Sequence, residues 1–220
     1  MNTNPRATTI LCYGDSNTWG QKPDKSGRYP ANERWTGRLQ AALGPTYYVI
    51  EEGLSSRTTD LDYDKKPGRN GKTYLVPCLA SHNPLDVVVL MLGTNDLKIE
   101  FNRSAHAIAQ AIAGLVKDIQ QNALTRQGTV PKIVLVSPIL VDAKAREFTK
   151  LYADIYYNAE SAEKSKLLAG EIKEAANASG CAFVDASQYG GPGVDGIHFS
   201  PEAHIGLAEA LKNTILSLEH

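Results

Sequence analysis

Short apolar runs rich in β-branched residues alternate along this chain with longer segments of helical periodicity. The runs predict buried strands over residues 8–13, 47–51, 86–92, 132–137 and 181–185. The longer segments predict helices over residues 34–43, 105–121, 162–178 and 201–218, the last with Ser200 as N-cap and Pro201 in its first turn. This alternation is typical of βαβ units, so we expect an α/β fold: a doubly wound, flavodoxin-like parallel five-stranded sheet with helices on both faces.

Two connections in this pattern are long, residues 21–33 and 58–77. Both are rich in Gly, Pro, Lys and Asp and are predicted to be loops. Long loops in a compact domain usually carry function or form an interface, although plain surface excursions are about as common.

Composition narrows the class of protein. The 220 residues, 42% apolar and 21% charged, suit one domain over 1–220. The net charge of −1, with both signs interspersed, argues against nucleic-acid or membrane partners. The apolar runs are too short for a signal peptide or a membrane span, so we expect a cytoplasmic protein. Cys12, Cys78 and Cys181 have no metal-ligand spacing and are expected to be small buried residues in a reducing compartment.

Candidate chemistry lies in two short stretches near opposite ends of the chain, YGDSNTWG and VDGIHFS. They supply Ser16, Asp195 and His198, the parts of a serine hydrolase. A serine hydroxyl needs a base to take its proton, and a carboxylate fixes the tautomer of that base. Asp195 and His198 are three residues apart, so one turn lets the carboxylate reach Nδ1 and leaves Nε2 for Ser16.

The predicted topology brings the marked segments together. Ser16 follows the first strand, residues 53–56 the second, residues 93–96 the third, and the Asp195–His198 pair comes after the fifth. Because ligands bind beyond the carboxyl ends of strands in open α/β sheets, we expect all of them on one edge.

Four blocks in order, GDSNTWG, EEGLSSRTT, MLGTNDLK and DGIHFS, resemble those of the SGNH (GDSL-type) hydrolases. Together with Trp19 and the RWTG segment, they look most like the bacterial arylesterase and acyltransferase branch. The resemblance implies the SGNH hydrolase fold, catalysis by Ser16, Asp195 and His198 with no metal or cofactor, and a homo-oligomer. The absence of a Gly-x-Ser-x-Gly elbow argues against an α/β-hydrolase proper.

The same resemblance implies an oxyanion hole. Its donors would be the backbone N–H groups of Ser16 and of residue 56, and the side chain of Asn95. The family usually has glycine where this chain has Ser56. A serine N–H keeps the role if its φ stays negative, and Gly53 is the alternative donor.

The leading hypothesis is a serine esterase of the arylesterase type that hydrolyses small carboxylic esters of short acyl chains through an acyl-enzyme, with possible acyl transfer to alcohols. A carbohydrate O-deacetylase is the alternative within the same chemistry. A flavodoxin-like module that binds a nucleotide or phosphate is the alternative of another class, although no Gly-x-Gly-x-x-Gly or Walker sequence follows the first strand. We expect a small substrate site walled by residues near the four blocks: Asn17, Trp19, Thr94, Lys98 and Ile197, with Tyr156 and Tyr157 as a further wall.

Overall fold

The computed structural model describes residues 3–218, so the first two and last two residues of the chain lie outside it. Its centre is a five-stranded sheet in the order β2-β1-β3-β4-β5, in which all neighbouring strands are parallel. The strands are β1 (Thr8–Gly14), β2 (Tyr47–Gly53), β3 (Val87–Met91), β4 (Lys132–Ser137) and β5 (Ala182–Asp185). This confirms the predicted doubly wound sheet, in which β1 lies inside and the chain winds outward in both directions.

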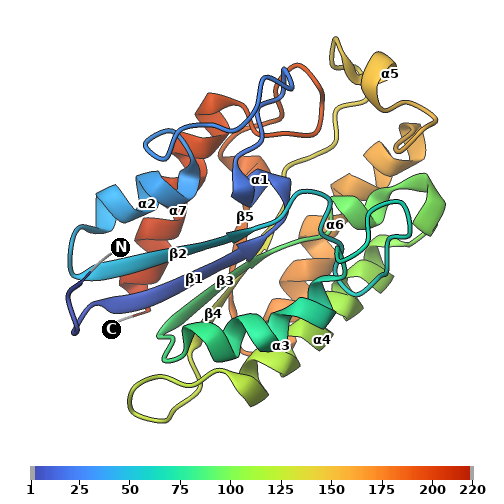
Figure 1. The fold of residues 1–220 in the computed structure, drawn as a ribbon. Coiled ribbons are helices and arrows are strands. Elements are labelled where there is room, and N and C mark those ends of the chain that lie inside the picture. The colour runs from blue at the N-terminus through green and yellow to red at the C-terminus, as the bar shows by residue number, and fades with distance from the viewer. Residues whose placement is uncertain (1–2, 219–220) are drawn as a thin grey trace.

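Helices cover both faces of the sheet (Figure 1). On one face lie α2 (Trp35–Leu43) and α7 (Pro201–Ser217), and on the other α3 (Gly71–His82), α4 (Ala105–Asn122) and α6 (Ala159–Ala178). Two single-turn helices, α1 (Ser16–Trp19) and α5 (Phe148–Leu151), lie in connections, as do three 3-10 turns, Asn95–Leu97, Ile99–Phe101 and Ala186–Gln188. The four predicted helices are all present, with ends within three residues of those expected.

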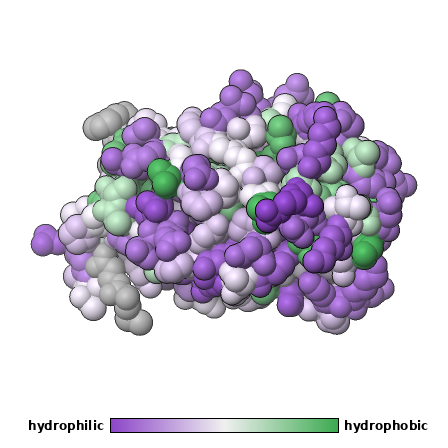
Figure 2. Space-filling model, turned by 90° about the horizontal axis from the view of Figure 1, so that it is seen from above, coloured by the Kyte–Doolittle hydropathy of each residue, from purple (hydrophilic) through white to green (hydrophobic). Residues whose placement is uncertain are grey.

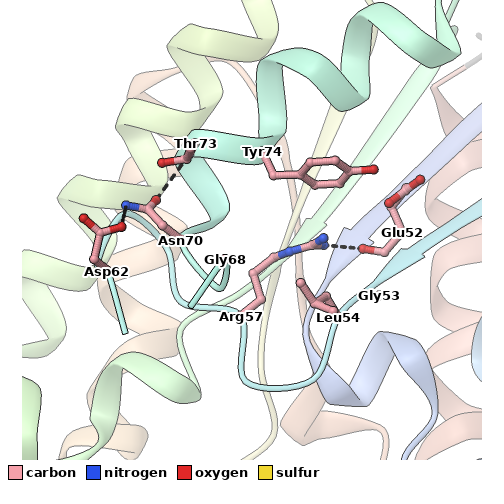
Figure 3. A pocket seen from close by; sticks show the side chains of 9 residues that line it. All are labelled: Glu52, Gly53, Leu54, Arg57, Asp62, Gly68, Asn70, Thr73 and Tyr74. Atoms are coloured by element: carbon pink, nitrogen blue, oxygen red, sulfur yellow. Dashed lines mark hydrogen bonds between the residues drawn. The ribbon is translucent and has the colours of Figure 1, made fainter. Parts of the chain in front are cut away.

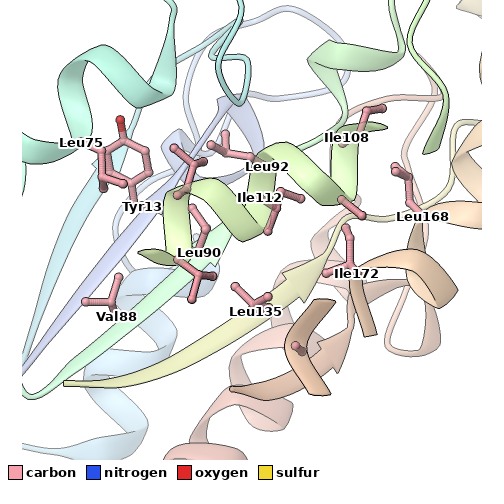
Figure 4. Packing of buried hydrophobic residues seen from close by; sticks show 14 of the residues in the cluster. Tyr13, Leu75, Val88, Leu90, Leu92, Ile108, Ile112, Leu135, Leu168 and Ile172 are labelled. Atoms are coloured by element: carbon pink, nitrogen blue, oxygen red, sulfur yellow. The ribbon is translucent and has the colours of Figure 1, made fainter. Parts of the chain in front are cut away.

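The two helical layers pack on opposite sides of each strand because side chains alternate along a strand. In β1, Leu11 and Tyr13 belong to the apolar cluster under α3, α4 and α6, part of which is drawn in Figure 4. Ile10 and Cys12 of the same strand belong to the cluster under α2 and α7. A strand buried on both sides reads as a continuous apolar run, which is why the sequence identified the strands well.

Helix α3 is the main difference from the predicted elements, since its first half falls in the connection predicted over residues 58–77. Asn70 caps this helix by accepting hydrogen bonds from the N–H groups of Lys72 and Thr73. Pro77 lies inside the helix, where it supplies no N–H for the hydrogen-bond ladder. A proline in the middle of a segment argues against a helix from sequence alone, and here the burial of Leu75, Cys78 and Leu79 outweighs that cost.

The surface carries its exposed apolar side chains singly. Figure 2 shows a face on which hydrophilic residues predominate and hydrophobic ones form small separate spots. The large exposed apolar residues are spread along the chain, among them Tyr74 of α3, Ile155 and Leu167 of α6. Across residues 3–218, none of the helices combines the length and the hydropathy that crossing a bilayer requires. The compartment and the oligomeric state stay predictions.

Candidate active site

Three adjacent strands, β2, β1 and β3, end level with one another at their carboxyl ends. Gly14, the last residue of β1, pairs with Gly53 of β2 on one side and with Met91 of β3 on the other. The segments that follow these strands therefore leave the sheet at the same edge. There, together with the loop before α7, they enclose a cavity of about 160 Å³ that Ser16, Ser56, Asn95 and His198 all line.

Ser16 opens helix α1 directly after the first strand. Asp15 is the N-cap of this helix and accepts a hydrogen bond from the N–H of Asn17 (2.9 Å). The turn fits tightly against the end of β2, because a Cβ on Gly53 would lie 2.2 Å from the Trp19 backbone nitrogen. Only glycine allows this approach, and it fixes the position of the helix that carries Ser16.

Ser16, His198 and Asp195 form one chain of hydrogen bonds. Ser16 Oγ lies 2.9 Å from Nε2 of His198, and Nδ1 of His198 lies 2.6 Å from Oδ2 of Asp195. The other oxygen of Asp195 accepts from the N–H groups of Ile197 (3.0 Å) and His198 (2.9 Å). Gly196 makes this turn possible, since it has φ +75° and a Cβ there would lie 2.2 Å from the Asp142 carbonyl oxygen.

The protonation states suit a base and its carboxylate. Burial lowers the pKa of His198, although the hydrogen bond and charge of Asp195 oppose this shift. Burial by itself would raise the pKa of Asp195, but the hydrogen bond and charge of His198 and the two backbone N–H groups outweigh it and lower that pKa. At neutral pH the imidazole is therefore uncharged and able to take a proton, and the carboxylate is ionised.

Asp195 has two further partners that the sequence did not reveal. Lys25 Nζ lies 3.0 Å from its Oδ2, and the hydroxyl of Tyr152 donates to the same oxygen at 3.1 Å. The ammonium of Lys25 also lies 4.4 Å from the centre of the Tyr152 ring. Lys25 belongs to the long connection 21–33, and the glycine- and lysine-rich composition of that loop was the available indication. Tyr152 had no comparable indication.

Asn95 is held at the cavity by the residue that precedes the serine. Its Nδ2 donates to Oδ2 of Asp15 at 3.3 Å, and both side chains are buried. Burial raises the pKa of Asp15 to about 6. An amide nitrogen has two hydrogens, so Asn95 can give one to Asp15 and keep the other for a ligand in the cavity.

The backbone conformation of Ser56 differs from the one required of it as an oxyanion-hole donor in the sequence-based prediction. Its φ is +69°, in the left-handed region, so the condition of a negative φ is not met. This is the conformation that a glycine at this position adopts without strain, and a serine there costs about 1–2 kcal/mol. The loop is held in place by Arg57, whose Nη1 donates to the Gly14 carbonyl at 2.9 Å. Ser56 lines the same cavity as Ser16, whereas Gly53 does not, which favours Ser56 over Gly53 as a donor.

The predicted walls of the site divide into two groups. Lys98 and Ile197 line the cavity, as do Tyr156 and Tyr157. Asn17, Trp19 and Thr94 are not among the residues that line this cavity, and their contact with substrate stays a prediction.

Two of these side chains make contacts elsewhere, and the third is buried. Asn17 donates to the Ile197 carbonyl (3.3 Å) and accepts from the N–H of Phe199 (2.9 Å), so it clamps the backbone on both sides of His198. Trp19 is half-buried, with the Arg28 guanidinium over its ring. Thr94 is buried. Neighbours of a site residue in a tight turn point in different directions, which spacing alone does not resolve.

A larger cavity of about 550 Å³ lies next to the same loop (Figure 3). Leu54 and Arg57 line it, whereas Ser55 and Ser56 line the smaller cavity, so loop 54–57 contributes to both. Its walls include several polar groups: an Arg57 guanidinium N–H donates to the Glu52 backbone carbonyl, and Nδ2 of Asn70 donates to Asp62 at 3.2 Å.

Within residues 3–218, one group has the donor types of a metal site. Atoms of Glu52, Cys78 and His82 lie within 4.8 Å of one another. Cys78 and His82 are four residues apart on α3. His82 Nε2 is already 2.9 Å from Glu52 Oε1, and burial raises the pKa of the Cys78 thiol to about 12. In this structure the group consists of a hydrogen-bonded pair, His82 and Glu52, beside a buried cysteine.

Comparisons with known proteins agree with this geometry. A family model described as GDSL-like Lipase/Acylhydrolase matches residues 12–204. The solved aryl esterase of M. smegmatis is 39% identical with a TM-score of 0.86, and the match covers 96% of this chain and 100% of that one. A solved carbohydrate acetylesterase from Sinorhizobium meliloti is also 39% identical, with a TM-score of 0.85 over 96% of this chain and 99% of that one.

A curated relative is similar over a shorter region. An acetylxylan esterase from Xylanibacter ruminicola is 30% identical over 149 residues, which is 60% of this chain. The matched region is 28% of that protein, so this chain corresponds to little more than a quarter of its length.

Proposed function

Because this chain belongs to the GDSL-like lipase/acylhydrolase family, we propose that it is a serine esterase that hydrolyses short-chain carboxylic esters through an acyl-enzyme. The observation that carries the proposal is the continuous hydrogen-bonded chain from Ser16 through His198 to Asp195. Two of its members are 182 residues apart in sequence, and their meeting at a cavity is hard to explain as a packing accident.

In the first half of the reaction, Nε2 of His198 takes the proton of Ser16 as Oγ bonds to the ester carbonyl carbon. The carbonyl π electrons move onto oxygen, and the N–H groups of Ser16 and Ser56 and the amide of Asn95 stabilise the oxyanion. As the carbonyl re-forms, the ester C–O bond breaks and His198 gives its proton to the departing alcohol. Asp195 stabilises the transient imidazolium and keeps its tautomer fixed.

In the second half, the acyl group leaves Ser16 for an incoming hydroxyl compound. His198 takes a proton from water, the hydroxide bonds to the acyl carbon, and collapse of the second oxyanion returns the proton to Ser16. An alcohol in place of water gives a new ester, so the same residues support acyl transfer.

The size of the cavity favours small acyl groups. About 160 Å³ accommodates only a few heavy atoms beyond the reacting carbonyl. The walls include the rings of Tyr63, Tyr152, Tyr156 and Tyr157, which suit an aromatic or otherwise flat alcohol group. This supports the arylesterase reading over a long-chain lipase.

A carbohydrate deacetylase is the second candidate. The cavity of about 550 Å³ on the other part of loop 54–57 is lined by Glu52, Arg57, Asp62 and Asn70, which are suitable partners for sugar hydroxyls. An acetyl group in the small cavity with its sugar toward the large one would use both. Comparison of kcat/KM for 4-nitrophenyl acetate and for a peracetylated xyloside separates the two candidates.

Labelling by a fluorophosphonate tests the central proposal. Intact mass should rise by one adduct, and the modified peptide should contain Ser16. The Ser16→Ala protein should remain unlabelled. A label on another residue would contradict the role of Ser16. A lack of labelling together with a cofactor retained through purification would favour the binding-module hypothesis instead.

A further inference from the structure

We propose that the esterase cavity selects substrates that carry an anionic group, such as a carboxylate, because three lysines line its wall. The inference rests on the proposed esterase function and specifies its substrate class. Lys25, Lys66 and Lys98 all line the cavity, and no aspartate or glutamate is found among its lining residues in the described part of the chain. Three positively charged side chains that surround a cavity of about 160 Å³ form an unusual environment for a neutral ester.

Lys98 is the most informative of the three. The residue is 5% exposed, and its ammonium lies 4.2 Å from the centre of the Tyr63 ring. Over residues 3–218, no carboxylate lies within ion-pair distance of it. A buried ammonium is costly unless it is paired, and a ring face offsets only part of that cost. Burial and the neighbouring Lys66 lower the pKa of Lys98 to about 8, so the group is mostly charged at pH 7.

Lys66 adds a second positive charge to the lining of the cavity. Its Nζ donates to Oγ of Ser56 at 3.0 Å, so it is fixed beside the proposed oxyanion donor. It too lacks an ion-pair partner among the residues described. Lys25 differs, because its charge is matched by Asp195 at 3.0 Å. The unmatched charge therefore comes from Lys66 and Lys98.

Three carboxylates near Lys98 reduce the positive charge of the cavity lining without cancelling it. Asp15, Asp96 and Glu100 attract Lys98 but do not contact it. Each is already engaged: Asp15 with Asn95, Asp96 with Arg103 at 3.0 Å, and Glu100 with Lys65 at 2.9 Å. A substrate carboxylate in the cavity would reach the two free ammonium groups more closely than these side chains do.

A second role for the same lysines is stabilisation of the oxyanion itself, and the two roles predict different results. Charge near the oxyanion favours the transition state of every ester alike. Charge that pairs with a substrate carboxylate favours only the substrate that has one. The ratio of kcat/KM for an anionic ester to that for its neutral counterpart therefore isolates the proposed role.

The experiment uses two matched pairs of esters at pH 7.0. In the first pair the charge is on the acyl side: the mono-4-nitrophenyl ester of adipic acid and the 4-nitrophenyl ester of monomethyl adipate. In the second it is on the alcohol side: 4-acetoxybenzoate and its methyl ester. Each kcat/KM is divided by the rate constant for hydroxide-catalysed hydrolysis. We expect the anionic member to be preferred about tenfold in one pair, which corresponds to about 1.4 kcal/mol.

Three variants test which lysines produce the preference for the anionic ester. Lys66→Gln and Lys98→Gln should each lower the preference about threefold or more. Lys72→Gln is the matched control, since it removes an equal charge from an exposed position nearby that does not line the cavity, and it should leave the ratio unchanged. The thermal midpoint of each variant is measured alongside, and a ratio is unaffected by partial unfolding because both esters report the same active fraction.

The outcomes are distinct. A preference for the neutral ester in both pairs overturns the proposal, and so does an equal loss for both members in Lys66→Gln and Lys98→Gln. Hydrolysis of neither 4-acetoxybenzoate nor its methyl ester, or hydrolysis that survives Ser16→Ala, contradicts the esterase function instead. Added NaCl should weaken the anionic preference and leave the neutral ester almost unaffected.

Discussion

Replacement of Asn95 by alanine is the sharpest test of the oxyanion hole. The side chain lines the cavity beside Ser16, and its Nδ2 donates to the buried Asp15. The substitution removes one donor from the place where charge develops in the transition state. Because the ester carbonyl carries little charge before reaction, the loss should fall on kcat and leave KM almost unchanged.

The expected size follows from two separate losses. Loss of one oxyanion donor costs about 2.7–4 kcal/mol in the transition state, which lowers kcat by about 100- to 1,000-fold. The substitution also leaves Oδ2 of Asp15 without its partner in a buried place, which costs about 1–3 kcal/mol of folding free energy. For a chain of this length, each kcal/mol lowers Tm by about 2–4 °C. Activity and stability should thus fall together, by amounts that can be measured independently.

Steady-state kinetics on 4-nitrophenyl acetate and a thermal melt together check this reasoning. The neighbouring Thr94→Val variant is the comparison, because Thr94 is buried near the same turn and its hydroxyl has no hydrogen-bond partner among the described residues. It should keep kcat within about threefold of the original protein. A fall of less than tenfold in kcat for Asn95→Ala, or a rise in KM that accounts for the whole loss, would show that Asn95 does not contact the oxyanion.

Further outcomes follow from the same geometry. Ser16→Ala and His198→Ala should each abolish most turnover, and the double variant should be little worse than either, since the residues act as one unit; additive losses in kcat/KM would contradict this. Burial lowers the pKa of His198 and so keeps it an active base below its ordinary range, which places the acidic limb of the pH profile below pH 6.5. Lys25→Met removes a cation that lowers the same pKa, so that limb should move to higher pH, and an unmoved limb would refute the coupling. Ser56→Ala keeps the backbone N–H and should cost far less than Asn95→Ala in parallel kinetics. Along 4-nitrophenyl esters from acetate to decanoate, kcat/KM should peak at short chains; a steady rise, driven by about 0.8 kcal/mol per buried methylene, would disprove the small cavity.

The sequence predicted the sheet and the edge of the site well because both depend on strong local patterns. A strand such as Val87–Met91, buried on both sides, leaves an uninterrupted apolar run. The position of Ser16 after one strand and of Asn95 after another then places both at the same edge, whatever the details of the loops. The sequence did not predict helix α3 because a proline inside a segment normally argues against a helix, and Pro77 lies inside this one.

Side-chain direction was not predictable in the same way. Asn17 is next to the serine in sequence, and its amide binds the backbone on both sides of His198. Lys25 and Tyr152 reach Asp195 from connections whose path no periodicity describes. The left-handed Ser56 results from tertiary contacts of its loop, and a serine carries no local preference that announces it.

The clamp between Asn17 and the backbone around His198 has a consequence for the synthesis of the protein. Chains emerge from the ribosome N-terminal end first, so the strand and turn that carry Ser16 exist long before residues 195–199 are made. During that interval the serine has no base, and the amide of Asn17 has no backbone to bind. The nascent chain is therefore inactive as a hydrolase. Activity begins only when residues 195–199 pack against the turn that carries Ser16.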